Sequence, residues 1–289
     1  VKKAKPWTVM SSYNRINGEF VGDKKEYLTE ILREEWGFDG YVVSDWGAVN
    51  DRVSSLAAGL DLEMPPGDYE NDRLIVKAVQ EGKLDESVVN QACERVLDVI
   101  FRYAENRDTD AVFDYEKDHA AAAEIEAECM VLLKNENEIL PLTSDKKIAF
   151  IGKYAKTPRY QGAGSSLVNP AKQPEAILDV IGSTDLDVVA YEQGYIRNRK
   201  PNQKLTKAAV ELAKKADIVL FFGGLDEISE SEGLDRTHMS MPAAQETLLN
   251  ELTTVNKNII VVLSAGSAIE MPWYPYVKGI VHGYLGGQA

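Results

Sequence analysis

The short apolar run at residues 41–43 constrains the fold more than any other stretch. Its three residues, Tyr-Val-Val, are aromatic or β-branched, and Gly40 and Gly47 bound the segment. Such a run is typical of a strand buried on both faces, as in a parallel sheet covered by helices, rather than a half-exposed antiparallel strand.

The surrounding residues repeat an order of strand and then helix. Residues 7–13, 41–43 and 60–64 predict strands, and residues 27–36 and the segment ending at Gly59 predict helices between them. This alternation is the βα repeat of a parallel sheet or barrel.

Two further helices are predicted after residue 70, and Asp85 is the expected N-cap of the second. Residues 107–118 then break the helical periodicity with charged and turn-forming residues. We interpret this segment as an inter-domain linker, and a long loop is the alternative. A long helix beginning at His119 is expected to present Ala122, Ile125, Cys129 and Leu132 to a core.

The second half of the chain predicts another α/β unit with a mainly parallel sheet in three layers. Its expected strands share short β-branched runs, and they lie at residues 148–152, 187–191, 218–223, 259–263 and 279–284. Its expected helices lie between them, at residues 175–181, 207–216 and 243–255.

Composition excludes several classes of partner. The net charge of −14 argues against a nucleic-acid backbone and against an anionic membrane, and no apolar run is long enough to cross a bilayer. Cys93 and Cys129 lie in amphipathic helix patterns, which predicts buried thiols in a reducing, cytoplasmic compartment. The three histidines are far apart and have no neighbouring cysteine, so no metal site is predicted.

Asp45 follows the 41–43 strand directly, with Trp46 beside it. In parallel α/β folds the carboxyl ends of the strands are where chemistry is done, so a carboxylate and an aromatic ring there could bind a sugar. The alternative is that Asp45 only caps the next helix.

The segment 230–236, Glu-Ser-Glu-Gly-Leu-Asp-Arg, places three carboxylates in one loop after the 218–223 strand. Such a cluster is either well solvated or arranged so that one acid keeps its proton. The Gly-rich segment 162–166 lacks the ending of a phosphate-binding loop, and we interpret it as a place of close backbone approach to a neighbouring domain or a neutral ligand.

Taken together, these motifs resemble glycoside hydrolase family 3, the β-glucosidase type, over the whole chain. The resemblance rests on Met-Ser-Ser-Tyr-Asn and Ile-Asn-Gly, on Val-Ser-Asp-Trp, on Gly-Leu-Asp-Leu-Glu-Met-Pro, on Gln-Gly-Ala-Gly-Ser-Ser and on the 230–236 segment, in the order of the family. It implies the C-terminal part of a (β/α) TIM-type barrel at residues 1–106, a linker at 107–118 and an α/β sandwich domain at 119–289.

The resemblance also implies roles for individual residues. Asp45 corresponds to the nucleophile and Glu232 to the general acid/base, and Met10, Tyr13 and Trp46 correspond to the sugar-binding subsite. Glu230, Asp235 and Arg236 are assigned to loop structure, and Glu63 to a structural role near the barrel rim. No metal or organic cofactor is implied.

Retaining hydrolysis needs two carboxylates in different protonation states. Asp45 must be ionised, whereas Glu232 must hold a proton near neutral pH, so its pKa should be raised by partial burial or by the charge of Asp45. The expected substrate is a terminal β-glucoside or an oligosaccharide. β-Xylosides and α-arabinofuranosides are alternative substrates. Two alternatives of other classes are a non-catalytic carbohydrate-binding fragment and a nucleotide-binding domain, the latter suggested by the Gly-rich segment alone. A homo-oligomer is a possible assembly.

One departure from the family concerns the barrel. The chain has no Lys-His dipeptide, and about three of the eight βα units can be counted. We therefore expect the isolated chain to be inactive and poorly soluble without an N-terminal barrel segment, supplied in cis or in trans.

Overall fold

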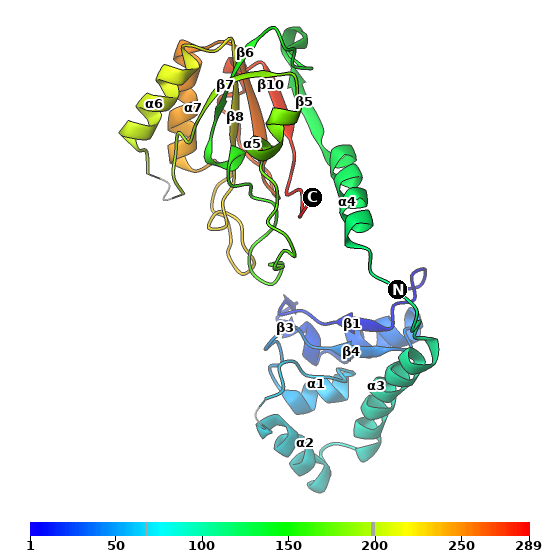
Figure 1. Ribbon diagram of the computed structural model, residues 1–289. Helices are drawn as coiled ribbons and strands as arrows, with labels where there is room; N and C mark the ends of the chain where they lie inside the picture. The colour runs from blue at the N-terminus through cyan, green and yellow to red at the C-terminus, as the bar shows by residue number, and fades with distance from the viewer. Residues whose placement is uncertain (68, 198–199) are drawn as a thin grey trace. The chain divides into compact units, whose positions relative to one another are not determined.

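The computed structural model describes residues 1–67, 69–197 and 200–289 (Figure 1). The chain divides into two compact units, Val1–Val112 and Phe113–Ala289, and each is described by itself. The boundary between them falls within the segment interpreted as a linker, and the division into residues 1–106, 107–118 and 119–289 stays a prediction.

The first unit combines short strands with longer helices. In chain order its elements are β1 (Thr8–Met10), β2 (Arg15–Ile16), β3 (Glu19–Phe20), η1 (Val21–Asp23), the π-helical η2 (Glu26–Glu35), β4 (Tyr41–Val43), α1 (Arg52–Ala58), α2 (Glu70–Gln80) and α3 (Glu86–Asn106). β1 and β4 are parallel, with Met10 opposite Val43. A single parallel bridge joins Val43 to Leu62, and β2 and β3 form a separate antiparallel hairpin.

Local capping explains the helix ends in this unit. The Asp51 side chain accepts a 2.7 Å hydrogen bond from the backbone N–H of Ser54 and begins α1, and Gly59 ends it with a φ of 113°. The Asp85 side chain caps α3 by accepting from the N–H of Ser87, as predicted.

An ionic cluster lies inside the first unit, beside the apolar core that Leu28, Leu32 and Val42 share. The carboxylate of the buried Asp61 accepts hydrogen bonds from Arg33 at 2.5 Å and from Arg95 at 2.9 Å. It also accepts one from the backbone N–H of Val42, in β4, at 2.8 Å. This cluster ties the strand that precedes Asp45 to η2 and α3.

The second unit is built on one sheet. Its elements are α4 (Tyr115–Cys129), β5 (Val131–Asn135), η3 (Glu136–Glu138), β6 (Lys147–Ile151), η4 (Lys153–Ala155), α5 (Ile177–Val180), η5 (Ile181–Ser183), β7 (Asp187–Glu192), α6 (Gln203–Ala213), β8 (Ile218–Gly224), α7 (Ala243–Val255), β9 (Ile259–Ser264), η6 (Tyr274–Tyr276) and β10 (Gly279–His282). In the described part of the chain the strand order is β5-β10-β9-β8-β6-β7, and only β5 runs antiparallel to its neighbour.

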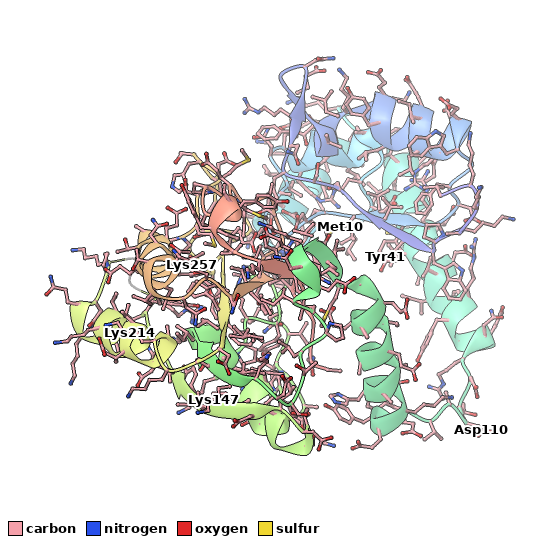
Figure 2. All side chains as sticks on the ribbon, turned by 90° about the horizontal axis from the view of Figure 1, so that it is seen from above. Met10, Tyr41, Asp110, Lys147, Lys214 and Lys257 are labelled. Carbon is pink, nitrogen blue, oxygen red and sulfur yellow. The ribbon has the colours of Figure 1, made fainter. Side chains whose placement is uncertain are left out.

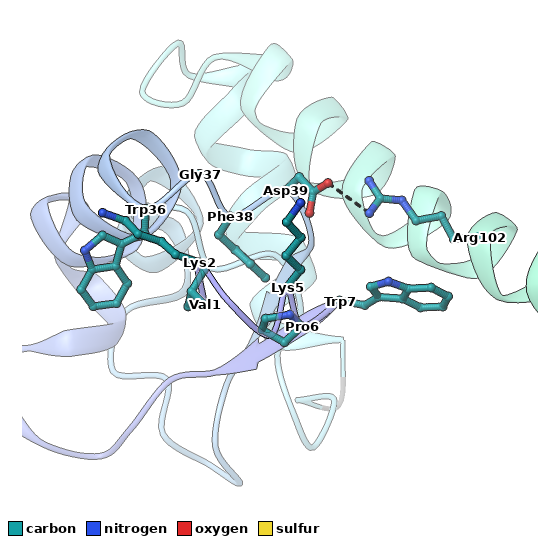
Figure 3. A pocket seen from close by; sticks show the side chains of 10 residues that line it. All are labelled: Val1, Lys2, Lys5, Pro6, Trp7, Trp36, Gly37, Phe38, Asp39 and Arg102. Atoms are coloured by element: carbon teal, nitrogen blue, oxygen red, sulfur yellow. Dashed lines mark ion pairs between the residues drawn. The ribbon is translucent and has the colours of Figure 1, made fainter.

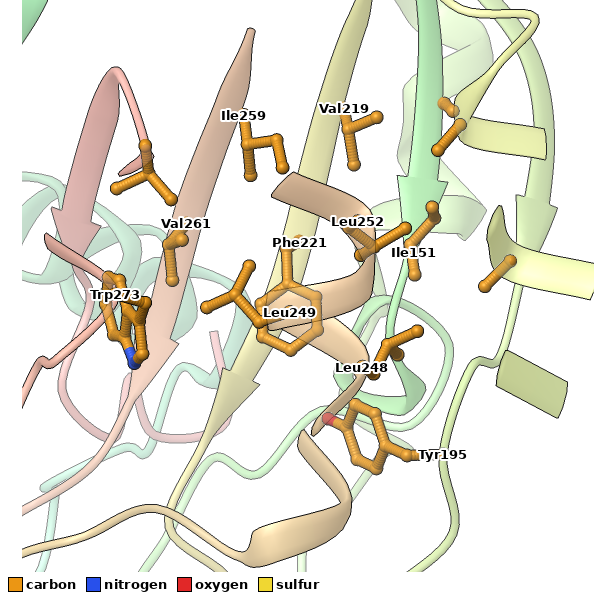
Figure 4. Close-up of a cluster of buried hydrophobic side chains, with 14 of the residues drawn as sticks. Ile151, Tyr195, Val219, Phe221, Leu248, Leu249, Leu252, Ile259, Val261 and Trp273 are labelled. Atoms are coloured by element: carbon orange, nitrogen blue, oxygen red, sulfur yellow. The ribbon is translucent and has the colours of Figure 1, made fainter. Parts of the chain in front are cut away.

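Apolar cores lie on both faces of this sheet, because its central strands carry apolar residues on both sides. On one face, side chains of α7 such as Leu248 and Leu252 pack against Phe221 and Val261 of the sheet (Figure 4). The opposite core contains Phe150 and Phe222, with other elements packed against it. β8 is buried along its whole length, as a parallel strand between two layers should be. The α/β class is thereby confirmed, with a mixed sheet.

Charged side chains cover the outside of both units. Asp110, Lys147, Lys214 and Lys257 are exposed, and Figure 2 labels each of them. Among the described residues no helix has both the length and the apolar character needed to cross a membrane.

Several expectations about single elements were wrong. Residues 60–64 contribute one bridge rather than a strand. The long helix begins at Tyr115, four residues earlier than expected, and although all of α4 is described, none of its residues is buried. Leu132 belongs to β5 and is exposed.

Both thiols are exposed, contrary to the expectation of burial. Cys93 lies on α3, where Ala92 is buried, and Cys129 ends α4. An amphipathic pattern predicts which residues share a helix face, but it does not tell whether that face is covered.

Candidate active site

Asp45 lies at the carboxyl end of β4, as predicted. Its Oδ1 accepts a 2.6 Å hydrogen bond from the backbone N–H of Trp46 and lies 3.1 Å from the Tyr13 hydroxyl oxygen. The same hydroxyl lies 2.9 Å from the carbonyl oxygen of Trp46, so the Tyr13 proton can be donated to either acceptor. Asp51 rather than Asp45 caps α1, which removes the capping explanation for Asp45.

Exposed side chains surround this carboxylate. Trp46 is 67% exposed, Met10 63% and Tyr13 48%, although large apolar side chains are usually covered. Tyr13 is held against Asp45 by hydrogen bonding, whereas Met10 ends the neighbouring strand β1, opposite Val43. The structure thus places three of the four predicted first-unit residues in one bonded group and Met10 on the adjacent strand end.

Ser44 fixes the turn that carries Asp45, a role that the sequence reasoning missed. Its hydroxyl accepts from the Met64 N–H at 2.8 Å and lies 3.1 Å from the Met64 carbonyl oxygen. The Gly47 N–H donates to the same carbonyl at 2.8 Å. This role of Ser44 could have been predicted from its position between a buried strand and Asp45. Glu63 accepts from Asn71 at 2.6 Å and pairs with Arg52 at 3.5 Å, so it has structural contacts.

Glu232 lies in the second unit, at the tip of a tight turn. A bridge between Ser231 and Leu234 closes this turn, and Gly233 supplies the φ of 74° within it. The Glu232 side chain is exposed, and its Oε2 accepts a 2.6 Å hydrogen bond from the backbone N–H of Ser165.

The Gly-rich segment is therefore part of the surroundings of Glu232. Gly164 has a φ of 87°, and a Cβ there would lie 2.6 Å from the Cβ of Glu232, closer than side chains can pack. The prediction of close backbone approach was made from the glycines, but their partner was not found, because it lies 67 residues further along the chain.

The pKa of Glu232 differs from the expectation. Hydrogen bonds from the Ser165 side chain and then from its backbone N–H lower the pKa of this carboxyl, whereas a raised pKa was expected. The physical reason is that these bonds stabilise the ionised form, while the exposed side chain pays little desolvation cost. Asp45 and Glu232 belong to different units, and each is described within its own unit.

The first unit also contains a cavity away from Asp45. This cavity has a volume of about 360 Å³ and is lined by Trp7, Trp36, Asp39 and Arg102 among others. Figure 3 shows these side chains. Trp7 precedes β1 and Asp39 precedes β4, so this cavity lies at the amino ends of the strands, opposite to Asp45. Among the described residues, no cluster of three or more His, Cys, Asp or Glu side chains could hold a metal ion.

Comparison with known proteins gives related sequences and structures over the whole chain. At the level of sequence, the chain is 47% identical to the thermostable β-glucosidase B of Acetivibrio thermocellus over 292 residues, which is 100% of this chain and 38% of that protein. It is 42% identical to an exo-α-(1→6)-L-arabinopyranosidase of Bifidobacterium breve over 301 residues, which is 100% of this chain and 39% of that protein.

A solved structure gives the same relationship in space. The crystal structure of a glycoside hydrolase family 3 β-glucosidase from Bifidobacterium adolescentis matches with a TM-score of 0.90 at 43% identity, over 100% of this chain and 42% of that chain. The chain thus spans about two fifths of the length of these relatives.

Two family models divide the sequence between them. The glycosyl hydrolase family 3 N terminal domain matches residues 1–99, and the glycosyl hydrolase family 3 C-terminal domain matches residues 130–289. The chain belongs to glycoside hydrolase family 3.

Proposed function

We propose that this chain supplies both catalytic carboxylates of a retaining β-glucosidase, with Asp45 as nucleophile and Glu232 as general acid/base. The observation that carries the proposal is the placement of Asp45 at a strand's carboxyl end, with one oxygen facing the Tyr13 hydroxyl and the Trp46 N–H. These contacts fix the position of the carboxylate that would attack as nucleophile. The β-glucosidase names of the two relatives support the choice of glucose.

In the proposed reaction, Asp45 attacks the anomeric carbon of a terminal β-glucosyl residue while Glu232 protonates the departing oxygen. The glycosyl ester on Asp45 is then hydrolysed by water, from which Glu232 takes a proton. The sugar would be contacted by Trp46, Tyr13 and Met10. Trp46 and Tyr13 would contact it through their ring faces, and Tyr13 also through its hydroxyl. Glu232 must hold its proton in the substrate complex, so its pKa must rise when substrate and Asp45 come close.

The finer architecture is part of the same proposal. Residues 1–106 would form the C-terminal part of a TIM-type barrel, residues 107–118 a linker, and residues 119–289 an α/β sandwich domain. β1 and β4, with the Leu62 bridge, form a small parallel sheet in the described chain, and a barrel needs eight such strands. We propose that a barrel segment, in cis or in trans, completes the site. A homo-oligomer and a cytoplasmic location stay predictions.

The test of the nucleophile uses Asp45→Ala in the form of the protein that includes the completed barrel. We expect this change to abolish hydrolysis of an aryl β-glucoside, and added azide to restore cleavage with a glycosyl azide of inverted configuration as product. An Asp45→Ala protein with kcat near that of the wild type would overturn the assignment.

The test of the acid/base residue compares leaving groups. Glu232→Ala should lower kcat/KM by about 10²- to 10⁴-fold for poor leaving groups, and much less for activated aryl glycosides that hardly need protonation. An equal loss for all leaving groups would remove the acid/base role from Glu232.

Arabinoside hydrolysis is a second candidate, because of the relative named an exo-α-(1→6)-L-arabinopyranosidase. Arabinopyranose lacks the exocyclic hydroxymethyl group of glucose. The ratio of kcat/KM for aryl β-glucoside and aryl α-L-arabinopyranoside decides between them, and a ratio below one would favour the arabinoside.

A further inference from the structure

The turn that carries Glu232 is anchored at both of its ends. Glu230 precedes it and Arg236 follows it, and the side chains of both bond to the hydroxyl of Ser267. Ser267 donates to Glu230 Oε2 at 2.5 Å and accepts from Arg236 Nη1 at 2.9 Å. Arg236 Nη1 also donates to the carbonyl oxygen of Ala268 at 2.7 Å. One hydroxyl thus joins the two stems of the Glu232 turn, which are the chain segments before and after it at Glu230 and Arg236.

The first stem is also bound by a buried cation, Arg159, which contacts the other carboxylate oxygen of Glu230. Arg159 is only 4% exposed, and its Nη1 forms an ion pair with Glu230 Oε1. The same nitrogen donates to the carbonyl oxygen of Leu225, directly after β8, at 3.1 Å. The Gly266 N–H adds a 2.8 Å hydrogen bond to Glu230 Oε1.

These anchors follow neighbouring strands of the second unit's sheet. Leu225 follows β8, Ser267 follows β9, and Arg159 follows η4, which comes directly after β6. β6, β8 and β9 are adjacent and parallel, so their carboxyl ends share one edge. The anchors are therefore loop residues that follow three neighbouring strands at the same edge of the sheet.

The charge state of Glu230 agrees with this geometry. Burial acts to raise the pKa of its carboxyl, but hydrogen bonds from Ser267 and Gly266 and the ion pair with Arg159 outweigh burial and lower that pKa. Glu230 is thus held as an anion that can bind Arg159 and Ser267 together.

We propose that Glu230, Ser267 and Arg159 are positioning residues that hold the turn so that Glu232 meets the Ser165 N–H and, in the substrate complex, the glycosidic oxygen. The second part rests on the proposed function, whereas the first concerns this chain alone. A clamp of this kind serves catalysis because proton transfer tolerates little displacement, and a shift of about 1 Å can cost about 10²-fold in rate.

The direct test measures hydrogen exchange of the Ser165 amide, whose N–H donates a hydrogen bond to Glu232. Ser267→Ala removes the hydroxyl that joins the two stems and leaves no buried charge unpaired, because Glu230 keeps Arg159 and Gly266. We expect the hydrogen exchange of the Ser165 amide to become about tenfold faster or more, since a hydrogen bond to a charged group is lost for much of the time.

Controls separate the clamp from the fold of the unit. Ser183→Ala removes another exposed hydroxyl of the same unit, which donates to the Val180 carbonyl at 2.7 Å and does not touch the turn. It should leave Ser165 exchange unchanged, and amides of β8 should exchange equally slowly in every variant. Wild-type exchange at Ser165 in Ser267→Ala would overturn the clamp.

A second variant tests the charged contact. Glu230→Gln keeps the shape of the side chain but removes the anion beside the buried Arg159, so the effect on Ser165 should exceed that of Ser267→Ala. Faster exchange of the β8 amides as well would show that this variant loosens the unit as a whole. The result for Ser267→Ala then decides whether the turn is held by these residues.

Leaving-group dependence tests the catalytic part in the form that hydrolyses aryl β-glucosides. Ser267→Ala should lose more kcat/KM with poor leaving groups than with activated ones, in the same direction as Glu232→Ala but less. If Glu232→Ala lacks this dependence, the proposed function fails while the exchange result still tests the clamp. If Glu232→Ala has it and Ser267→Ala does not, the positioning role in catalysis is wrong.

Discussion

Removing the buried Asp61 charge should strongly destabilise the first unit. This side chain is 1% exposed, and it accepts from two guanidinium groups and from the Val42 N–H. Asp61→Asn keeps the shape of the side chain but leaves Arg33, whose own side chain is 9% exposed, without its anionic partner.

The expected loss follows from burial. Breaking a buried ion pair by removing one partner costs about 3–5 kcal/mol, because the remaining charge is uncompensated. A typical domain has only about 5–15 kcal/mol of stability in total. Asp39→Asn is the matched control, because this carboxylate pairs with Arg102 at 3.2 Å but its side chain is 70% exposed (Figure 3). An exposed pair contributes about 0–1 kcal/mol.

The measurement is hydrogen exchange of peptides from η2 and α1 over a series of urea concentrations, which reports the unfolding free energy of the first unit alone. Peptides of β8 serve as an internal reference for the second unit. Equal, small losses for Asp61→Asn and Asp39→Asn would refute the argument from burial.

Two further predictions concern the second carboxylate. Gly164→Ala should raise the pKa of Glu232 toward its ordinary value in an NMR titration, because the new Cβ would break the hydrogen bond from Ser165. The control is Gly287→Ala, which should leave this pKa unchanged, because Gly287 has a similar φ of 71° but open space around it. The pKa of Glu230 is lowered in the folded chain, so its stabilising contribution is present above the ordinary carboxyl pKa and is lost as pH falls through the lowered value. Exchange at the Glu232 turn should therefore accelerate in that acid range before β8 does, and simultaneous acceleration would contradict this order.

Local signals predicted local structure well. Asp85 and Gly59 mark helix ends correctly, because a cap depends on the residue itself and its nearest neighbours. The strand before Asp45 was predicted for the same reason, since three consecutive residues determine its character. The contact between Tyr13 and Asp45 follows from the parallel pairing of β1 with β4, which brings their carboxyl ends together.

Long-range effects could not be predicted from one sequence. Whether Cys93 is buried depends on what covers α3, and the sequence pattern has no information on that. The partner of Glu232 lies on a loop after a different strand, and its N–H, unlike a side chain, leaves no residue-type signal. The lowered pKa of Glu232 follows from that missed contact, and the buried Asp61 cluster was missed because its arginines come from separate helices.

The nucleophile is the central claim, and covalent trapping tests it most directly. A 2-deoxy-2-fluoro-β-glucoside with a good leaving group destabilises the oxocarbenium-like transition states, so the glycosyl-enzyme ester accumulates. After incubation with the protein that includes the completed barrel, proteolysis and mass spectrometry locate the label. We predict a fluoroglucosyl ester on Asp45, and its absence from Asp45→Asn. A label on another carboxylate, such as Glu63, would contradict the account.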